Sequence, residues 1–334
     1  MSTTSKSPKA VARAAYAVAQ GTLPAHSHKF SPKRFTQPQL FVCLVLKVFY
    51  KTDYRGIVAI LEDSPDLCKA FDLSTVPHFT TLQKASKRLL RLRVANELLH
   101  NSVKTFGKSK KVALAAVDST GLEARHISRH FVRRRRSKQL EIYETTHYRR
   151  WPKLAVVCDC RNHLILSAIT TRGPSPDINQ FEKTLTPAIN RYTIKHILAD
   201  AGYDSESNHR FARERHHIRS TIPPRHGRPT TKPFQGKYRR LMQQRFNRRT
   251  YGQRWQVETV FSMIKRNQGD VLRSRTYWSQ NREMLLKVLT HNIGIILLTK
   301  ELFYKAYRTP LIPPAVDKRT VVYLRLSVRF AYYG

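Results

Sequence analysis

Acidic residues are scarce in this sequence of 334 residues. Only 22 Asp and Glu accompany 61 Lys and Arg, which leaves a formal net charge of +39. Such an excess gives the surface a strong positive field and favours polyanionic partners. Nucleic acid is the first expectation, because neutralising its phosphates releases condensed counterions. An anionic membrane surface, or a ribosomal or RNA-packaging role, would suit the same charge, so charge alone does not separate these classes.

Cysteine is scarce as well. The four cysteines are Cys43, Cys68, Cys158 and Cys160, and no two of them form a Cys-x-x-Cys pair. Cys158 and Cys160 form a Cys-x-Cys pair with no second half, which argues against a zinc site. We expect reduced thiols in a cytosolic protein.

Long hydrophobic runs are absent. The N-terminus lacks the continuous apolar core of a signal peptide. The most apolar late stretch, residues 284–298, is interrupted by Lys287, His291 and Asn292. It is too short and too polar to span a bilayer, so we expect a core helix there and no membrane partner. The chain can nevertheless bury a core, because 41% of its residues are hydrophobic.

The N-terminal third divides into a basic arm and a helical region. Residues 1–34 carry six Lys or Arg and no acid, which indicates a flexible arm, with at most a short helix around residues 10–20. Residues 35–105 predict a helical domain with helices from Leu40, over residues 55–62, and from Val76-Pro77 behind a Thr75 cap.

The third of these helices is polar and basic. A short helix, a turn and a basic helix resemble a helix-turn-helix unit, in which Gln83, Lys84 and Lys87 would contact DNA. An ordinary helical bundle with a solvated basic face fits the same pattern equally well.

From about residue 110, short apolar runs replace the helical pattern. Their order predicts an α/β catalytic domain over residues 106–300, with a ribonuclease-H-like mixed sheet and flanking helices. The expected elements are strands at 112–117, 153–158 and 163–169, a helix at 178–192, a strand at 196–199, a helix from a Ser205 cap to 216, and a strand at 218–222.

Two basic segments adjoin this pattern. Residues 225–249 carry nine Lys or Arg and no acid, and a second run comprises Arg133, Arg134, Arg135 and Arg136. Charge runs are usually solvated faces or tails. Both runs lie beside candidate catalytic residues in the sequence, which favours a DNA channel. Residues 301–334 form a tail of unknown role.

Two predicted strands each deliver an aspartate at their end, Asp118 and Asp200. One such aspartate is more often a turn or capping residue, but a repeated one points to a site, because α/β proteins place ligands at strand ends. Asp204 lies beyond the second strand and ranks behind Asp200.

A proline-free segment, residues 250–266, predicts a helix. At about 100° per residue, its polar stripe adjoins an apolar face formed by Val257, Val260, Phe261 and Ile264. Such a stripe also arises by chance on solvated helices. Its members are Tyr251, Arg254, Glu258 and Lys265.

Here the sequence resembles a known family. Tyr251-x2-Arg254-x3-Glu258-x6-Lys265 matches the YREK signature of DDE transposases of prokaryotic insertion sequences, and Asp118 and Asp200 resemble that family's first two aspartates. The resemblance runs from about residue 36 to about residue 300. It includes the helical N-terminal region, which is similar to the family's end-recognition domain.

The resemblance implies a mechanism and a partner. Asp118, Asp200 and Glu258 would hold two Mg²⁺ (or Mn²⁺) ions, and Tyr251 with its signature partners Arg254 and Lys265 would hold DNA. The enzyme would bind terminal inverted repeats, cleave DNA and join it to a target. Its partners would be double-stranded DNA at transposon ends and target, and a second copy of the chain in a homodimeric synaptic complex, in the nucleoid of a prokaryotic cytoplasm.

Two other functions stay open at this point. The protein could be a DNA-binding protein that keeps the fold but no longer transposes. It could also be a ribonuclease-H-like nuclease that cleaves without strand transfer. The intact trio argues against the first alternative, and the Tyr-Arg-Lys companions argue against the second.

Overall fold

The computed structural model describes residues 6–105, 110–124, 151–173, 175–226 and 233–308, with side chains described to residue 297. Met1–Leu298 form one compact unit and Thr299–Gly334 form a second. The fold described here is that of the first unit. No helix in the described ranges has both the length and the apolar character that crossing a membrane requires.

Six helices form the N-terminal region, and local sequence signals start several of them. The Ser7 side chain caps α1, Thr36 and Gln39 form a capping box at α2, and Asp53 caps α3. Helix α2 is the centre of this group, since its apolar side chains from Leu40 to Leu46 are almost fully buried. The bounds are α1 Pro8–Gln20, α2 Gln37–Phe49, α3 Tyr54–Glu62, α4 Pro65–Lys69, α5 Phe79–Leu89 and α6 Leu92–Thr105.

Two predictions for this region are corrected. The short helix considered around residues 10–20 is present as α1, but this part of the chain is not a free arm, because α1 buries five apolar side chains against the core. The third helix does not start at Val76-Pro77 behind Thr75. It starts at Phe79, because His78 is extended (ψ 148°) and its ring nitrogen bonds the Thr80 hydroxyl.

A five-stranded mixed sheet follows, in the order β5-β4-β2-β7-β8. Strand β2 is antiparallel to β4 and parallel to β7, and β7 is parallel to β8. The predicted mixed α/β architecture is confirmed. The strands are β2 Ala115–Gly121, β4 Pro152–Asp159, β5 Ile165–Arg172, β7 His196–Ala199 and β8 Arg219–Thr221. Four short strands pair outside it: β1 Lys111–Val112 with β6 Thr193–Ile194, and β3 Glu123–Ala124 with β9 Val271–Leu272.

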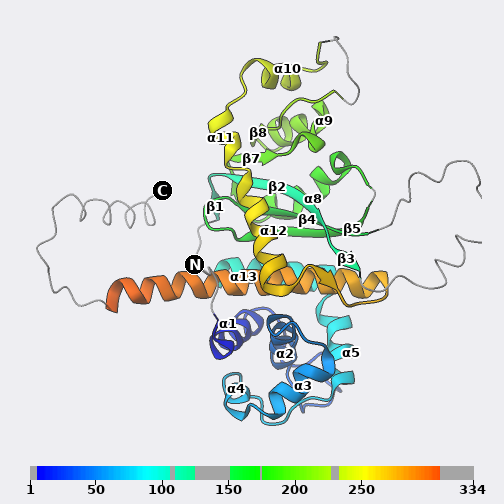
Figure 1. Ribbon diagram of the computed structural model, residues 1–334, viewed down its shortest axis with the longest axis vertical. Coiled ribbons are helices and arrows are strands. Elements are labelled where there is room, and N and C mark those ends of the chain that lie inside the picture. Colours follow the sequence, from blue (N-terminus) through cyan, green and yellow to red (C-terminus); the bar gives the residue numbers. More distant parts are fainter. Residues whose placement is uncertain (1–5, 106–109, 125–150, 174, 227–232, 309–334) are drawn as a thin grey trace, which may run out of the picture. The chain divides into compact units, whose positions relative to one another are not determined.

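Both faces of the sheet are covered. One face, including Ala116, Val156 and Leu198, joins the core formed with the N-terminal helices, α12 (Trp255–Gln268) and the start of α13 (Tyr277–Arg308). The other face, including Val117 and Val157, packs on α8 (Phe181–Ile189) and the segment after it. Figure 1 shows α12 crossing in front of the strands and running down towards α13.

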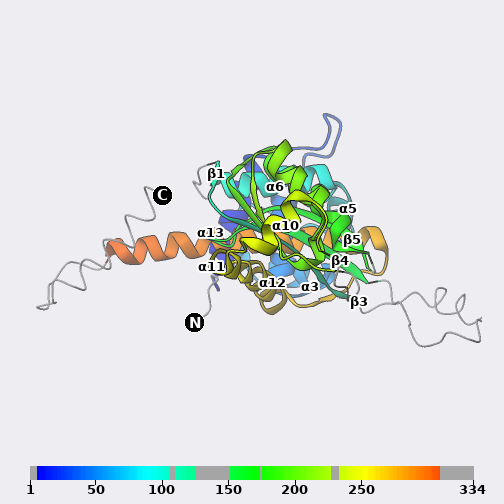
Figure 2. The ribbon, with the colours of Figure 1, turned by 90° about the horizontal axis from the view of Figure 1, so that it is seen from above.

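The predicted helix over residues 178–192 is shorter than expected. A 3₁₀ turn, η1 Asp177–Gln180, precedes α8, which ends at Ile189. The helix capped by Ser205 is confirmed and continues from α9 (Glu206–Arg210) into a π-helical turn, η3 Phe211–Arg215. Helix α10 (Lys237–Gln244) of the basic insertion packs against α9 beyond the β8 edge of the sheet (Figure 1). Seen from above, α10 overlies the middle of the molecule (Figure 2).

The predicted continuous helix over residues 250–266 is wrong. It is broken into α11 (Arg248–Gly252) and α12, and the Arg254 amide closes the break by donating to the Tyr251 carbonyl, three residues back. Gly252 favours the break, since glycine is among the weakest helix formers. Arg254 thereby becomes the residue that caps α12.

Candidate active site

Asp118 and Asp200 lie on neighbouring parallel strands. The last register pair of β2 and β7 is Val117 with Ala199, so each aspartate is the next residue of its strand's path. The prediction that Asp118 ends its strand is wrong. Strand β2 continues to Gly121 by pairing with β4. The strand end that matters is that of β7, and it brings the two carboxylates to one place on the sheet.

Helix α12 adds the third predicted carboxylate. Its buried face consists of Val257, Val260, Phe261 and Ile264, which confirms the predicted packing face. That face contacts β2 and β4, which leaves Glu258 on the border of the helix with a side chain 56% exposed.

Arg254 joins two of these carboxylates. Its Nη1 lies 3.0 Å from Asp118 Oδ2, and its Nη2 lies 2.5 Å from Glu258 Oε1. The Asp118 and Arg254 side chains are both largely buried, at 18% and 19% exposure. Strand β2 and helix α12, far apart in the sequence, are therefore linked through one guanidinium group.

The electrostatics of Asp118 follow from this packing. The pKa of Asp118 is raised to about 6, chiefly by burial and also by the charges of Asp200 and Asp177, while the Ser119 amide and Arg254 oppose the rise. The carboxylate of Asp200 instead accepts the Ala201 amide at 2.7 Å and is exposed. A carboxylate that is costly to ionise and faces other carboxylates is stabilised by a nearby cation.

Sequence reasoning missed two further groups beside Asp118. Asp177, the first residue of η1, accepts the Ser119 hydroxyl at 2.6 Å and pairs with Lys153 Nζ at 2.7 Å. Lys153, on β4, is only 8% exposed. A buried lysine on a central strand was the available signal, because lysine is almost never buried without a partner.

The residues suit a divalent metal in chemistry, although no metal cluster is formed. Within the described residues, no three His, Cys, Asp or Glu side chains are grouped closely enough to hold an ion. The three carboxylates offer the hard oxygen ligands that Mg²⁺ and Mn²⁺ prefer. A cation, Arg254, already bridges Asp118 and Glu258, so this site attracts positive charge.

Comparison with known families gives a result on this same part of the chain. The sequence model of the transposase DDE domain matches residues 109–293, more than half of the chain. The chain belongs to the transposase DDE domain family. The matched segment holds the whole five-stranded sheet and α12. No curated protein matches the sequence.

Tyr251 and Lys265, the other two residues of the predicted signature, lie near Arg254 and farther along α12, respectively. The Arg254 guanidinium lies 5.9 Å from the centre of the Tyr251 ring. Burial raises the pKa of Tyr251, and the charge of Asp200 adds to that rise. Lys265 lies two turns beyond Glu258 on α12 and is half-buried.

The residues predicted for DNA contact outside α12 divide into two groups. Gln83, Lys84 and Lys87 are all exposed on α5, outside the carboxylate cluster. The arginine run, Arg133, Arg134, Arg135 and Arg136, lies outside the described residues.

Asp204, which ranked behind Asp200 in the sequence, is buried in contact with α10. Its side chain is 2% exposed and pairs with Arg239 of α10 at 2.7 Å. It also accepts the Arg225 amide at 2.8 Å. Asp204 therefore holds the basic segment of residues 225–249 against the sheet domain, and its oxygens are already occupied.

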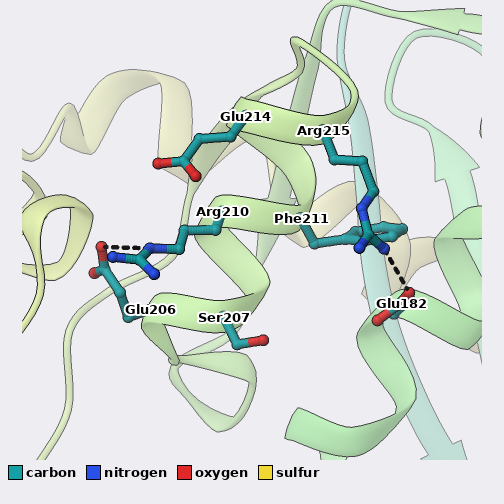
Figure 3. Close-up of a pocket in the computed structure, with 7 residues that line it drawn as sticks. All are labelled: Glu182, Glu206, Ser207, Arg210, Phe211, Glu214 and Arg215. Atoms are coloured by element: carbon teal, nitrogen blue, oxygen red, sulfur yellow. Dashed lines mark hydrogen bonds and ion pairs between the residues drawn. The ribbon is translucent and has the colours of Figure 1, made fainter.

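A separate cavity of about 570 Å³ lies between α8, α9 and η3 (Figure 3). Its charged groups largely neutralise one another: Glu206 lies 3.9 Å from Arg210, and Glu182 lies 3.5 Å from Arg215. Glu206 also accepts the amides of Tyr238 and Arg239 at the start of α10. These groups have structural partners, so we do not place the chemistry there.

Proposed function

We propose that this transposase binds the terminal inverted repeats of a prokaryotic insertion sequence and catalyses metal-dependent DNA cleavage and strand transfer. The observation that carries the proposal is the meeting of Asp118 and Asp200 on adjacent strands, with Arg254 linking Asp118 to Glu258. The YREK pattern of Tyr251, Arg254, Glu258 and Lys265 supports assignment to that branch of the family.

In this proposal Asp118, Asp200 and Glu258 hold two Mg²⁺ or Mn²⁺ ions. When bound, such a pair supplies a nucleophilic water or 3′-hydroxyl of lowered pKa and charge stabilisation for the leaving oxygen. The protein's own contribution begins with charge. With its pKa at about 6, Asp118 is ionised at neutral pH, so it presents a carboxylate rather than a carboxylic acid.

Arg254 has two possible partners in this proposal. Without DNA it neutralises Asp118 and Glu258. Once cations occupy the carboxylates, its guanidinium is free to grip a backbone phosphate bidentately. Tyr251, whose ring adjoins Arg254, and Lys265 hold the same DNA by stacking or hydrogen bonding and as a point charge.

The remaining regions are assigned to DNA as well. Residues 35–105 recognise the ends, with Gln83, Lys84 and Lys87 of α5 on the DNA side. Residues 106–300 form the catalytic domain, and the basic segment 225–249, with the run at Arg133 to Arg136, follows the DNA path. Two copies of the chain pair the two ends in a synaptic complex.

The test uses a supercoiled plasmid that carries the coding sequence with its natural flanking DNA on both sides. Purified protein with Mg²⁺ should excise the segment and join it to target DNA. A plasmid with only one flank should give no excised segment. EDTA should abolish cutting while leaving DNA binding intact.

The same assay separates the alternatives. Cutting that ignores whether both flanks are present, without joined products, would indicate a nuclease instead of a transposase. Binding to the flanks without any cutting would indicate a DNA-binding protein that no longer transposes.

A further inference from the structure

A basic cavity of about 420 Å³ lies where the N-terminal helices meet the segment after β9. Helices α2, α3 and α5 contribute one wall. The segment from Arg273 to Thr276 and the first turns of α13 contribute the other. The cavity therefore joins the region proposed for end recognition to the region that carries the catalytic residues.

The cavity is rich in cations, one of which, Lys47, lies 5.0 Å from the centre of the Tyr54 ring. Five line the cavity: Lys47, Lys87, Arg273, Arg275 and Arg282. Within the described residues, none of the five takes part in an ion pair. Their mutual repulsion is unfavourable, so an anion among them would be stabilised.

The two acids of the cavity, Asp53 and Glu283, offset only part of the charge of the five cations. Asp53 accepts the amides of Arg55 and Gly56 at the start of α3. Glu283 accepts the amides of Arg273 and Ser274 at 3.1 and 2.9 Å. Both carboxylates are used to fix the backbone of the walls, and the lining retains a net positive charge.

Neutral hydrogen-bonding side chains complete the lining. Gln83 and Ser274 line the cavity and carry side-chain donors, whereas the Thr276 and Ser279 hydroxyls already bond each other. Hydroxyl and amide donors beside Lys and Arg are the groups that proteins most often present to the phosphates and sugars of DNA.

The cavity also adjoins the C-terminal end of α12. A second cavity of about 180 Å³ shares Lys47, Arg273 and Glu283 with it. There Lys51 Nζ donates to the Arg266 carbonyl at 2.9 Å, and Lys287 Nζ donates to the Gln268 and Gly269 carbonyls. These bonds tie the helix that carries Glu258 to both walls of the cavity.

We propose that this cavity, defined by Lys47, Lys87, Arg273, Arg275 and Arg282, is a binding site for the backbone phosphates of duplex DNA. The proposal rests on the proposed function, because it takes the partner to be DNA. In this proposal the segment between β9 and α13 contacts the same duplex as α5, so that both hold the DNA together.

The experiment compares a cavity variant with a matched control. Arg275→Ala/Arg282→Ala removes two cations of the cavity. Arg93→Ala/Lys183→Ala removes two exposed cations of α6 and α8 that lie outside it. Fluorescence anisotropy with a labelled duplex of arbitrary sequence, repeated over a series of NaCl concentrations, gives the slope of log affinity against log salt.

The cavity variant should lose roughly 0.9 from the magnitude of that slope for each phosphate contact removed, hence about 2 for both. Its affinity should fall about tenfold or more at low salt, and the control slope should change much less. In the wild type, bound duplex should protect Arg275 and Arg282 from modification by phenylglyoxal, as measured by mass spectrometry.

Equal slope changes in the two variants would overturn the cavity as a site, since general electrostatics would then explain both. Unprotected arginines in the bound wild type would overturn it as well. Either result leaves the proposed function standing if the wild type still cuts its plasmid. A wild type that does not bind duplex DNA would overturn both proposals.

Discussion

Arg254 explains how the two acidic side chains Asp118 and Glu258 are held near each other. Asp118 is largely buried, and its pKa is raised by burial and by neighbouring carboxylates. A guanidinium that bonds both Asp118 and Glu258 offsets part of this repulsion. The fold is therefore compatible with a charged site before any DNA arrives.

Asp204 illustrates how a neighbouring aspartate differs from Asp200. Asp204→Asn leaves Arg239 without its buried counter-charge, so we expect the free energy of unfolding to fall by about 2–3 kcal/mol. Urea denaturation measures this loss. DNA cleavage at low temperature should persist, because Asp204 is occupied by Arg239 and the Arg225 amide.

The matched control is Asp63→Asn, since Asp63 is exposed at the end of α3. It should change stability by less than about 0.5 kcal/mol. A stable Asp204→Asn protein that fails to cut DNA would contradict the structural role and would favour Asp204 as a catalytic residue.

At the scale of elements, α12 is fixed at both ends. Arg254 ties its start to β2 through Asp118. At its other end Gly269 takes a positive φ of 85°, and Lys287 donates to the last carbonyls. Cations at a helix C-terminus are favourable, because they complement the helix dipole.

Lys287→Met should therefore loosen the end of α12. Lys287 is 3% exposed, and burial lowers its pKa to about 8. Losing its two hydrogen bonds leaves carbonyls without partners, at a cost of about 2 kcal/mol. Thermal denaturation should show a lower melting temperature for Lys287→Met. The control Lys183→Met, at an exposed position of α8, should leave the melting temperature unchanged. An unchanged melting temperature for Lys287→Met would show that the carbonyls find other partners.

Helix α5 tests sequence-specific recognition. Alanine at Gln83, Lys84 and Lys87 should weaken binding to the natural flanking DNA more than binding to arbitrary duplex, because base contacts specify and phosphate contacts do not. Competition gel shifts compare the two, with Lys69→Ala on exposed α4 as the control. An equal loss for both duplexes would mean that α5 touches only phosphates.

The sequence could predict the sheet and the packing face of α12, because strands and amphipathic helices have distinct apolar periods. It placed the end of β2 at Asp118, since hydrophobicity stops there, whereas the backbone pairing with β4 continues to Gly121. The break before α12 was also missed, because the apolar period continues across Gly252 although the backbone turns there, with the Arg254 amide donating to the Tyr251 carbonyl. Asp177 bonds Ser119 and pairs with Lys153 only through the fold, so a lysine within an apolar strand pattern does not by itself identify its partner.

At the scale of the whole molecule, buried histidines determine the response to acid. Burial lowers the pKa of His209 and of His291 to about 4. Each is neutral and bonded in the fold, His209 to Ser220 and His291 to the His163 carbonyl. Between about pH 6.5 and pH 4 the unfolded chain therefore binds more protons at these positions than the folded chain does.

Stability should consequently fall as the pH is lowered from 7 to 5, by on the order of 2 kcal/mol for each of these two histidines. Asp118, whose pKa is raised to about 6, acts in the opposite direction and reduces the total. Urea denaturation at each pH measures the effect, and His291→Gln should flatten the curve. Stability that rises steadily towards pH 5 would contradict this account.

Because of the high net charge of the whole molecule, we expect that DNA binding can be measured separately from DNA cleavage. With a net charge of +39, the protein should bind DNA even when one carboxylate is lost. Asp→Asn or Glu→Gln keeps the shape of the side chain and removes one charge, so binding should be unchanged or slightly tighter. The central claim is that Asp118, Asp200 and Glu258 act in cleavage and not in binding.

The most direct test measures binding and cleavage on the same duplex, taken from the natural flanking DNA, for Asp118→Asn, Asp200→Asn and Glu258→Gln. Asp66→Asn, exposed in α4, is the control. Each of the three variants should bind at least as well as wild type and lose cleavage in Mg²⁺ by at least about 100-fold, the scale of losing one group that stabilises transition-state charge. Near-normal cleavage by one variant would remove that residue from the proposed active site. Near-normal cleavage by all three would contradict the proposal that these carboxylates catalyse DNA cleavage.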